Sequence, residues 1–317
     1  MFVRQLGRSG LMVSALGLGC WAIGGPFWRG DNPVGWGDVD DNESLAALRR
    51  ALELGVTFFD TSDVYGCGHS ERILGQALQG RRDQVMIATK FGNVFDETTR
   101  KITGASGEPT LIRRACEASL RRLQTDYIDL YQFHIGDYAL ERAGEVLETL
   151  EALVTEGKIR WYGWSTDDPT RAAFFAQGEH CTAIQQRLNL FEGNADVLAL
   201  CEAQHLASIN RGPLAMGLLT GKFDHHSRLP ANDVRHQWDL QQGEAAQRLD
   251  RLDALRDVLT AQGHTPAQAA LGWLWARSGA TVPIPGFKNV AQVEENVGAL
   301  ARGPLSADQM ARIKELL

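Results

Sequence analysis

Short apolar runs alternate with amphipathic stretches along most of the chain, and this alternation limits the possible folds more than any other feature. The amphipathic stretches carry apolar residues at helical spacing, as Leu45, Leu48 and Leu52 do. Strands that alternate with helices are typical of parallel sheets, whose crossovers are helical. The runs are Ser14–Leu18, Val56–Asp60, Val85–Lys90, Tyr127–His134, Ile159–Ser165, Thr182–Gln185, Ala207–Asn210 and Thr281–Ile284. Eight such units predict one (β/α)8 TIM barrel domain covering residues 1–317.

Several segments fall outside the simple repeat. Phe2–Val13 contains the turn Gly7-Arg8-Ser9-Gly10 and predicts an N-terminal β-hairpin that closes the barrel floor. Trp21–Asp41 is a long loop rich in Gly and Trp, and Phe223–Gly243 is a long polar loop. Extra helices are expected near the C-terminus, where Thr265-Pro266 is a helix-start signal.

Composition limits the kinds of molecule that the protein is expected to bind. The net charge of −7 argues against nucleic-acid binding, which needs a basic face. No apolar run is long enough to span a bilayer, and the first residues lack the apolar core of a signal peptide. We therefore expect a cytoplasmic protein with no membrane partner, and a monomer. Five cysteines without a CxxC pair indicate neither a disulfide framework nor a zinc site, and the histidines of the loop Phe223–Gly243 lack companion ligands, so no metal is expected.

Four polar residues stand where apolar strands end. Asp60 closes the second run, Lys90 closes the third and His134 closes the fourth, while Tyr65 follows in the loop after Asp60. The carboxyl ends of parallel barrel strands converge on one mouth, where active sites lie. The sequence therefore predicts that these four side chains meet there.

The four residue types suit the reduction of a carbonyl group. Tyr65 has an ordinary pKa of about 10, and the ammonium of Lys90 is expected to lower it so that Tyr65 can donate a proton. Asp60 would pair with Lys90, and His134 would orient a carbonyl oxygen. Hydride transfer requires a nicotinamide cofactor, because no side chain supplies it. The alternative is structural: a buried Asp–Lys ion pair and a core histidine.

The chain resembles the aldo-keto reductases, most closely their bacterial and plant branches with a short C-terminus. The resemblance rests on motifs that run nearly end to end: Gly17-Leu18-Gly19, Phe59-Asp60-Thr61-Ser62-Asp63-Val64-Tyr65-Gly66, Ser70-Glu71, the stretch 120–131, Gly157-Lys158-Ile159-Arg160, Pro213-Leu214, Gly217-Leu218-Leu219-Thr220-Gly221-Lys222 and Ile284-Pro285-Gly286. It implies NADPH-dependent, reversible reduction of aldehydes or ketones, with Asp60, Tyr65, Lys90 and His134 as the catalytic residues.

The resemblance also implies an NADPH site without a Rossmann fold. Ser165, Thr166 and Gln185 would hold the nicotinamide carboxamide, and Arg211 would lie against the nicotinamide or the phosphates. The pyrophosphate would be covered by Leu214, Gly217, Leu218, Thr220, Gly221 and Lys222. Gly286, Phe287, Lys288 and Gln292 would surround the adenosine 2′-phosphate, with Lys288 as its main cation, and Glu295 and Asn296 would bind adenine. Relatives often have Asn at the position of Thr166 and Arg at that of Gln292, so these contacts are expected to be weaker here.

Trp21 matches a family position that lines the substrate pocket, and Trp28, Trp36 and Trp164 are further candidates. An aromatic cleft of this kind favours aromatic or medium aliphatic carbonyl compounds over highly charged ones. Two rival functions stay open. One is an NADP(H)-binding regulatory or redox-sensing subunit with little turnover, and the other is an unrelated barrel enzyme that acts on a phosphorylated substrate.

Overall fold

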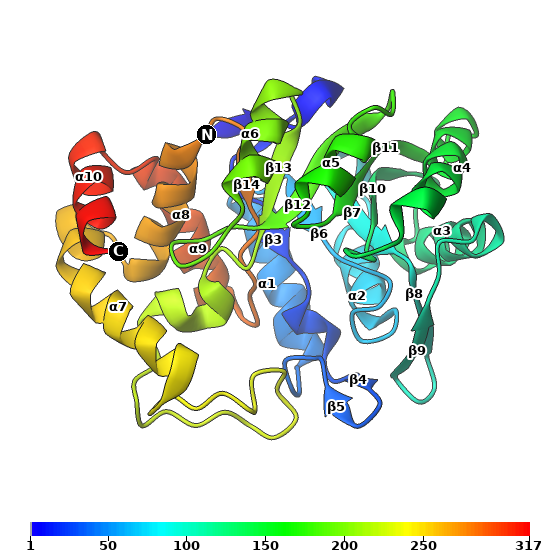
Figure 1. The fold of residues 1–317 in the computed structure, drawn as a ribbon. Coiled ribbons are helices and arrows are strands. Elements are labelled where there is room, and N and C mark those ends of the chain that lie inside the picture. Colours follow the sequence, from blue (N-terminus) through cyan, green and yellow to red (C-terminus); the bar gives the residue numbers. More distant parts are fainter. Residues whose placement is uncertain (1) are drawn as a thin grey trace.

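The computed structural model describes residues 2–317, and eight parallel strands form the barrel that the sequence predicts (Figure 1). The sheet order is β14-β13-β12-β11-β10-β7-β6-β3. A parallel bridge between Gly19 and Gly286 joins the two outer strands and closes the barrel. The strands are β3 (Leu18–Gly19), β6 (Phe58–Asp60), β7 (Met86–Phe91), β10 (Ile128–Phe133), β11 (Ile159–Ser165), β12 (Cys181–Arg187), β13 (Ala207–Arg211) and β14 (Thr281–Pro283).

The first barrel strand is shorter than the sequence predicts. The run Ser14–Leu18 was expected to be one strand, but Ser14 ends β2 (Met12–Ser14), and β3 begins only at Leu18. Ser14 pairs with Val3 in the N-terminal hairpin, and its N donates to Thr57 Oγ1 at 2.8 Å, so this residue belongs to the hairpin and not to the barrel ladder. Apolar content alone could not separate a hairpin strand from the barrel strand that follows it.

Helices surround the barrel, and a side chain caps the N-terminus of six of the ten α-helices of residues 2–317. Asp40 accepts hydrogen bonds from Asn42 N and Glu43 N, and Thr265 forms a reciprocal capping box with Gln268. No helix of residues 2–317 has the length and apolar character needed to cross a membrane. The helices are α1 (Asp41–Glu53), α2 (His69–Ala77), α3 (Pro109–Leu123), α4 (Ala143–Thr155), α5 (Pro169–Phe175), α6 (Ala195–Ala203), α7 (Gly243–Thr260), α8 (Pro266–Arg277), α9 (Val290–Arg302) and α10 (Ala307–Leu316). Because α9 follows the last barrel strand and packs against α8 and α1, the extra helices near the C-terminus are α7 and α10.

The predicted hairpin closes the barrel floor. Strands β1 (Val3–Gln5) and β2 pair antiparallel, and Leu6 between them is fully buried in the apolar cluster of the barrel interior. Thr182 Oγ1 donates to Leu6 O at 2.8 Å and accepts from Ser9 N at 3.0 Å. The hairpin is therefore fixed to the barrel by both packing and hydrogen bonds, and the opposite end is left for the site.

A second small sheet lies at that opposite end. Strands β4 (Trp28–Arg29) and β5 (Asn32–Pro33) come from the loop after β3, while β8 (Asn93–Asp96) and β9 (Lys101–Ala105) follow β7. They pair in the order β5-β4-β9-β8, and we call them the accessory sheet. The sequence predicted a loop over 21–41 and gave no signal for β8 and β9, because strands this short carry no readable alternation.

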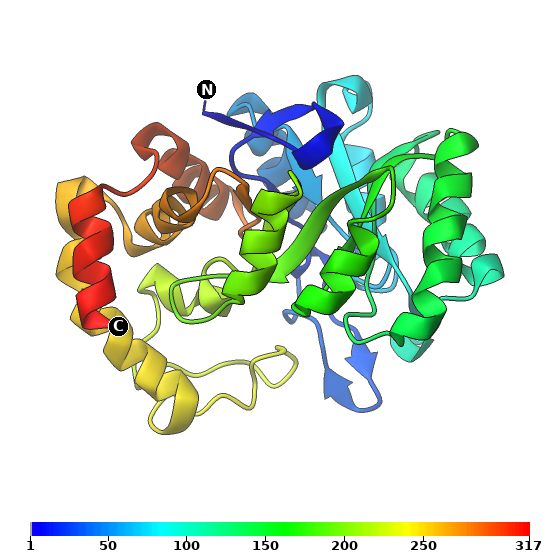
Figure 2. The ribbon, with the colours of Figure 1, turned by 45° about the horizontal axis from the view of Figure 1, so that its top comes forward.

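The long loop 223–243 approaches the same end. Figures 1 and 2 place it, with β4 and β5, at the end of the molecule opposite the N-terminal hairpin. An antiparallel bridge joins Trp36 to Asp233, and Val234 N donates to Gly35 O at 2.7 Å. Two segments about 200 residues apart in the chain are thus held together by backbone pairing above the barrel.

The loops after β3 and β6 touch at two glycines, which gives a test of how Tyr65 is positioned. Gly66 has φ +60°, and a Cβ there would lie 1.8 Å from Gly24 O. Gly80 has φ +72° with no atom near its Cβ position. We predict that Gly80→Ala lowers the free energy of unfolding by about 1–2 kcal/mol, the usual cost of a left-handed alanine. Gly66→Ala should lower it by clearly more, as measured by urea denaturation. Equal losses in the two variants would contradict the close approach.

Candidate active site

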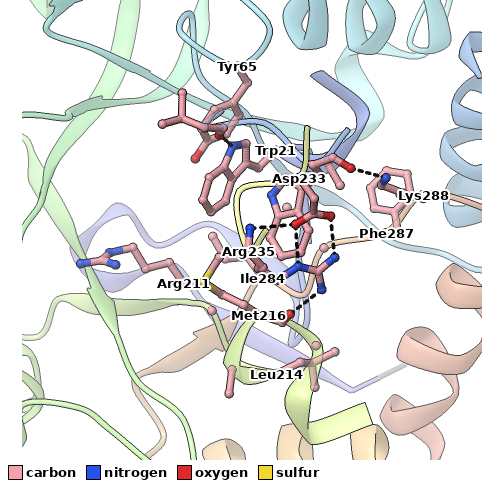
Figure 3. Close-up of a pocket in the computed structure, with 18 of the residues that line it drawn as sticks. Trp21, Tyr65, Arg211, Leu214, Met216, Asp233, Arg235, Ile284, Phe287 and Lys288 are labelled. Carbon is pink, nitrogen blue, oxygen red and sulfur yellow. Dashed lines mark hydrogen bonds and ion pairs between the residues drawn. The ribbon is translucent and has the colours of Figure 1, made fainter. Parts of the chain in front are cut away.

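One cavity of about 1030 Å³ opens at the carboxyl ends of the barrel strands (Figure 3). Its lining includes Asp60, Tyr65 and His134 together with residues of the accessory sheet and of the loop 223–243. Cavities that hold a single small ligand usually measure about 300–1,000 Å³. The volume lies at the upper end of this range, so the cavity can hold a large ligand.

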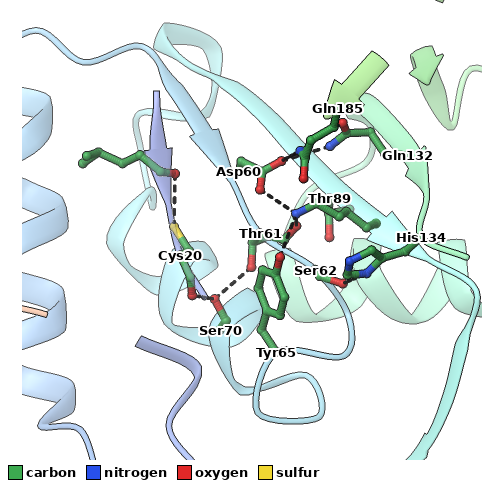
Figure 4. Close-up of polar contacts among 12 residues, drawn as sticks. Cys20, Asp60, Thr61, Ser62, Tyr65, Ser70, Thr89, Gln132, His134 and Gln185 are labelled. Atoms are coloured by element: carbon green, nitrogen blue, oxygen red, sulfur yellow. Dashed lines mark hydrogen bonds and ion pairs between the residues drawn. The ribbon is translucent and has the colours of Figure 1, made fainter. Parts of the chain in front are cut away.

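A polar network that includes Asp60, Tyr65 and Gln185 lies at the base of this cavity (Figure 4), and the ammonium of Lys90 is its centre. Lys90 Nζ donates to Asp60 Oδ1 at 2.5 Å, to Thr61 O at 2.7 Å and to Tyr65 Oη at 3.1 Å. Lys90 is fully buried and Asp60 nearly so. Burial by itself lowers the pKa of Lys90, but the charge of Asp60 and the contact with Tyr65 outweigh it and raise the pKa. Lys90 therefore stays charged where it meets the phenol oxygen.

The phenol of Tyr65 differs from the expectation in one respect. Burial raises its pKa above the ordinary value, and the ammonium of Lys90 opposes this rise without reversing it. The expected net lowering was wrong, because desolvation of the phenolate exceeds the attraction of one ammonium that is itself shared with Asp60. Tyr65 consequently keeps its proton at neutral pH, as an acid must before it donates. Its ring stacks on Trp21 with centroids 5.9 Å apart.

His134 lies beside this acid, with its ring edge-on to Tyr65 at 6.0 Å between centroids. Burial lowers the pKa of His134 well below the usual value, and the charges of Lys90, Arg211 and Arg29 lower it further. Ser62 Oγ lies 3.2 Å from His134 Nδ1 and 3.2 Å from Asp63 Oδ1. A neutral imidazole with Nδ1 engaged by Ser62 has Nε2 left for a ligand in the cavity.

Two glutamines complete the network. Gln132 Nε2 donates to Asp60 Oδ2 at 3.0 Å, and Gln185 Nε2 donates to the same oxygen at 2.8 Å. Gln185 was expected to hold a nicotinamide carboxamide, but here its amide nitrogen is engaged with Asp60, so its oxygen is the atom that can face a ligand. Gln132 was missed, because a single Gln within an apolar run gives no signal by itself.

Several cationic side chains line the part of the cavity away from Tyr65, among them Arg235 and Lys288 (Figure 3). Desolvation lowers the pKa of Lys222, and the nearby charges of Arg235 and Lys288 lower it further. Asp233 binds Arg235 through two hydrogen bonds of 2.9 and 2.8 Å. Lys288 Nζ donates to Trp36 O at 2.5 Å. Three cations thus repel one another, and only Arg235 has an ion pair with a carboxylate, so an anion such as phosphate would relieve this repulsion.

The residues predicted to bind the cofactor fall into two groups, those that line the cavity and those that do not. Most of them line this cavity: Ser165, Gln185, Arg211, Leu214, Gly217, Thr220, Lys222, Gly286, Phe287, Lys288, Gln292, Glu295 and Asn296. Thr166, Leu218 and Gly221 are not part of the lining. Thr166 Oγ1 donates to Gly136 O at 2.8 Å, and Leu218 is buried in the apolar core. Gly221 adopts φ +73° where the short helix Ala215–Thr220 ends.

The tryptophans predicted for the substrate pocket also fall into two groups, those that line the cavity and those that do not. Trp21 and Trp36 line the cavity and meet edge to face with centroids 5.3 Å apart. Trp164 is fully buried in the layer between strands and helices, and Trp28 is not part of the lining. Asp233 and Arg235 were missed, because an Asp–Arg pair two residues apart in a polar loop resembles any solvated turn.

The lowered pKa of His134 can be tested directly. We predict that its imidazole stays neutral as the pH falls from 8 through about 6.5, the ordinary histidine range. NMR of ring-labelled protein should show no chemical-shift titration for the signal that disappears in His134→Gln, with the other seven histidines as internal references. The unfolded chain binds this proton more readily than the folded one, so His134 should contribute a loss of stability as the pH falls below 6.5. A midpoint near 6.5 would contradict the inferred burial.

Comparison with known proteins agrees with this geometry. The model of the Aldo/keto reductase family matches residues 15–317. The NADP(+) aldo-keto reductase yakc of Schizosaccharomyces pombe is 31% identical over 307 residues, which cover 94% of this chain and 86% of that protein. The holo form of aldo-keto reductase AKR11C1 from Bacillus halodurans superimposes with a TM-score of 0.82 at 31% identity, covering 100% of this chain and 96% of that one. A Klebsiella pneumoniae aldo-keto reductase in complex with NADPH does so with a TM-score of 0.71 at 29% identity, covering 100% and 95%. This chain belongs to the aldo/keto reductase family.

Proposed function

We propose that this protein is an NADPH-dependent oxidoreductase that reduces aldehydes or ketones to alcohols, with Tyr65 as the proton donor. The observation that carries the proposal is the contact of Tyr65 Oη with the buried ammonium of Lys90 at 3.1 Å, inside a cavity that His134 also lines. A charged lysine next to a protonated phenol stabilises the phenolate that remains after proton transfer. The reverse reaction, alcohol oxidation, uses the same groups in the opposite order.

Each residue of the network has a separate task. Tyr65 donates its proton to the carbonyl oxygen, and the developing phenolate is stabilised by Lys90. Asp60, fixed by Gln132 and Gln185, holds Lys90 in place. In the neutral tautomer with the ring proton on Nε2, which requires Ser62 to donate to Nδ1, His134 donates a hydrogen bond to the same carbonyl oxygen, so it orients the substrate and leaves proton donation to Tyr65.

NADPH, when bound, supplies the hydride that reduces the carbonyl carbon. The charge distribution of the cavity supports its placement. Ser165, Gln185 and Arg211 would hold the nicotinamide end beside Tyr65, and Gly217, with φ +97°, permits close approach of the backbone. Lys222 and Lys288 would bind phosphate groups, and Glu295 and Asn296 of α9 would bind adenine. The NADPH complex of the Klebsiella pneumoniae relative supports this choice of cofactor.

The role of Tyr65 as the acid is tested by a substitution that removes its hydroxyl group. We predict that Tyr65→Phe lowers kcat for aldehyde reduction by about 10²–10⁴-fold, the usual contribution of a general acid, because Phe keeps the ring but has no hydroxyl. The measurement is NADPH absorbance loss with a reactive aldehyde. NADPH binding, followed by the ligand-induced shift in melting temperature, should be nearly unchanged in the variant.

Two results would count against this proposal. A variant that keeps more than about a tenth of the wild-type rate would exclude Tyr65 as the acid. A wild-type protein that binds NADPH tightly and reduces no aldehyde in a broad panel would favour the rival function, a regulatory or redox-sensing subunit.

The preference for NADPH over NADH should depend on Lys288. We predict a larger rise in melting temperature with NADPH than with an equal concentration of NADH, and a smaller difference in Lys288→Ala, because the ammonium that would bind the 2′-phosphate is lost. Lys288 also bonds Trp36 O, so the ligand-induced shift is compared rather than the melting temperature itself. Lys314→Ala in α10 is the control variant, since its side chain does not line the cavity. Equal shifts with both cofactors in the wild type would remove Lys288 from the cofactor site.

A further inference from the structure

The accessory sheet contributes three side chains to the wall of the cavity, Arg29, Asn93 and Ile102, and Arg29 is the only charged one of the three. In the parallel register of β4 and β9, Arg29 is opposite Ile102 and Trp28 is opposite Lys101. Residues opposite each other in a sheet share a face, and the next residues along the strands share the other face. Arg29 and Ile102 line the cavity, whereas Trp28 and Lys101 do not. Strand pairing therefore directs Arg29 to the cavity side of the sheet.

The charge of Arg29 is not neutralised by the protein. Three other arginines of the cavity wall have carboxylate partners: Arg187 with Glu192, Arg211 with Asp167, and Arg235 with Asp233. Among residues 2–317, Arg29 forms no ion pair, and its side chain donates only to the neutral amide of Asn93, at 3.4 Å from Oδ1. Asn93 also lines the cavity. The pair therefore presents guanidinium N–H donors together with an amide that can donate.

Arg29 is exposed, and apolar side chains line the same cavity close to the reacting groups. Trp21, Phe27, Val34 and Ile102 pack in one cluster with Tyr65, and all five line the cavity. Arg29 is also near enough to His134 for its charge to lower the pKa of that imidazole. Lys222 and Lys288 form no ion pair among residues 2–317, but they lie near Asp233 and Arg235 in the part of the cavity assigned to phosphate, and Arg228 belongs to the loop 223–243.

We propose that Arg29, supported by Asn93, binds an anionic group at the far end of the substrate, so that the preferred substrates are carbonyl compounds with an apolar body and a terminal carboxylate. The inference rests on the proposed function and assigns the substrate class of the same site. A planar guanidinium is well suited to a carboxylate, which it can bind through two parallel N–H donors. A carboxylate-binding Arg29 also corrects the expectation that an aromatic cleft here disfavours charged carbonyl compounds, since that expectation considered the tryptophans alone.

The test uses two aldehydes of nearly equal shape, 4-carboxybenzaldehyde and 4-carbamoylbenzaldehyde, which differ in charge. The wild type should have a higher kcat/KM for the carboxylate than for the amide. Arg29→Gln should lower this ratio by about 5- to 30-fold, the effect of one charge-assisted hydrogen-bonded pair partly open to water. The loss should lie mainly in KM, because the contact is the same in the ground state and the transition state.

Matched variants separate this role from general damage. Arg29→Lys keeps the charge and should retain part of the carboxylate preference. Lys101→Gln removes a cation from the other face of the same sheet and should leave the ratio unchanged. Added KCl should raise KM for the carboxylate and not for the amide in the wild type, because salt screens the attraction.

Three results would overturn the inference. They are a wild type without carboxylate preference, an unchanged ratio in Arg29→Gln, and a loss of preference in Arg228→Gln in place of Arg29→Gln. Each of these leaves amide turnover in place and so leaves the proposed function standing. Absence of turnover with both aldehydes and with a wider panel would instead contradict the carbonyl-reductase function itself.

Discussion

The buried ammonium of Lys90 is the constraint on which the rest of the site depends. A charge without exposure to water must be paired and hydrogen-bonded, or the group loses its charge. The three N–H groups of the Lys90 ammonium donate to Asp60, to Thr61 O and to Tyr65. The second oxygen of Asp60 is held by glutamines from β10 and β12. Four strands are thereby joined at one level of the barrel, and the position of the phenol oxygen follows from the needs of the lysine.

The same burial sets the protonation states of the neighbouring groups. It raises the pKa of Tyr65 and lowers that of His134, because an uncharged form is favoured in both cases. Only Lys90, which has a carboxylate beside it, moves toward its charged form. One environment thus leaves the proton on Tyr65 and the imidazole neutral. Under the proposed function, proton donation by Tyr65 and substrate orientation by His134 fall to different side chains, although both lie within one small volume.

The loops form the part of the cavity that would recognise the ligands, whereas Lys90 and Asp60 lie on barrel strands. The accessory sheet and the loop 223–243 form much of the cavity wall, and neither belongs to the closed ring of strands. Backbone pairing between Trp36 and Asp233 and the bond from Lys288 to Trp36 O hold them against each other. Changes in these loops can therefore alter which carbonyl compound fits without moving Lys90 or Asp60. Sites on loops above a rigid barrel are the usual arrangement for this fold.

The sequence by itself determined the barrel, its floor hairpin and the convergence of Asp60, Tyr65, Lys90 and His134, because buried parallel strands read as apolar runs and a polar residue at their ends is conspicuous. It did not determine the accessory sheet, whose strands are too short to show a period and pair over about 70 residues of chain. Only the tertiary structure decided that Thr166, Leu218 and Gly221 lie off the cavity lining, that Arg235 joins it, and that the pKa of Tyr65 rises. These outcomes depend on the sum of burial and neighbouring charge at each atom, which the order of residues along the chain does not contain.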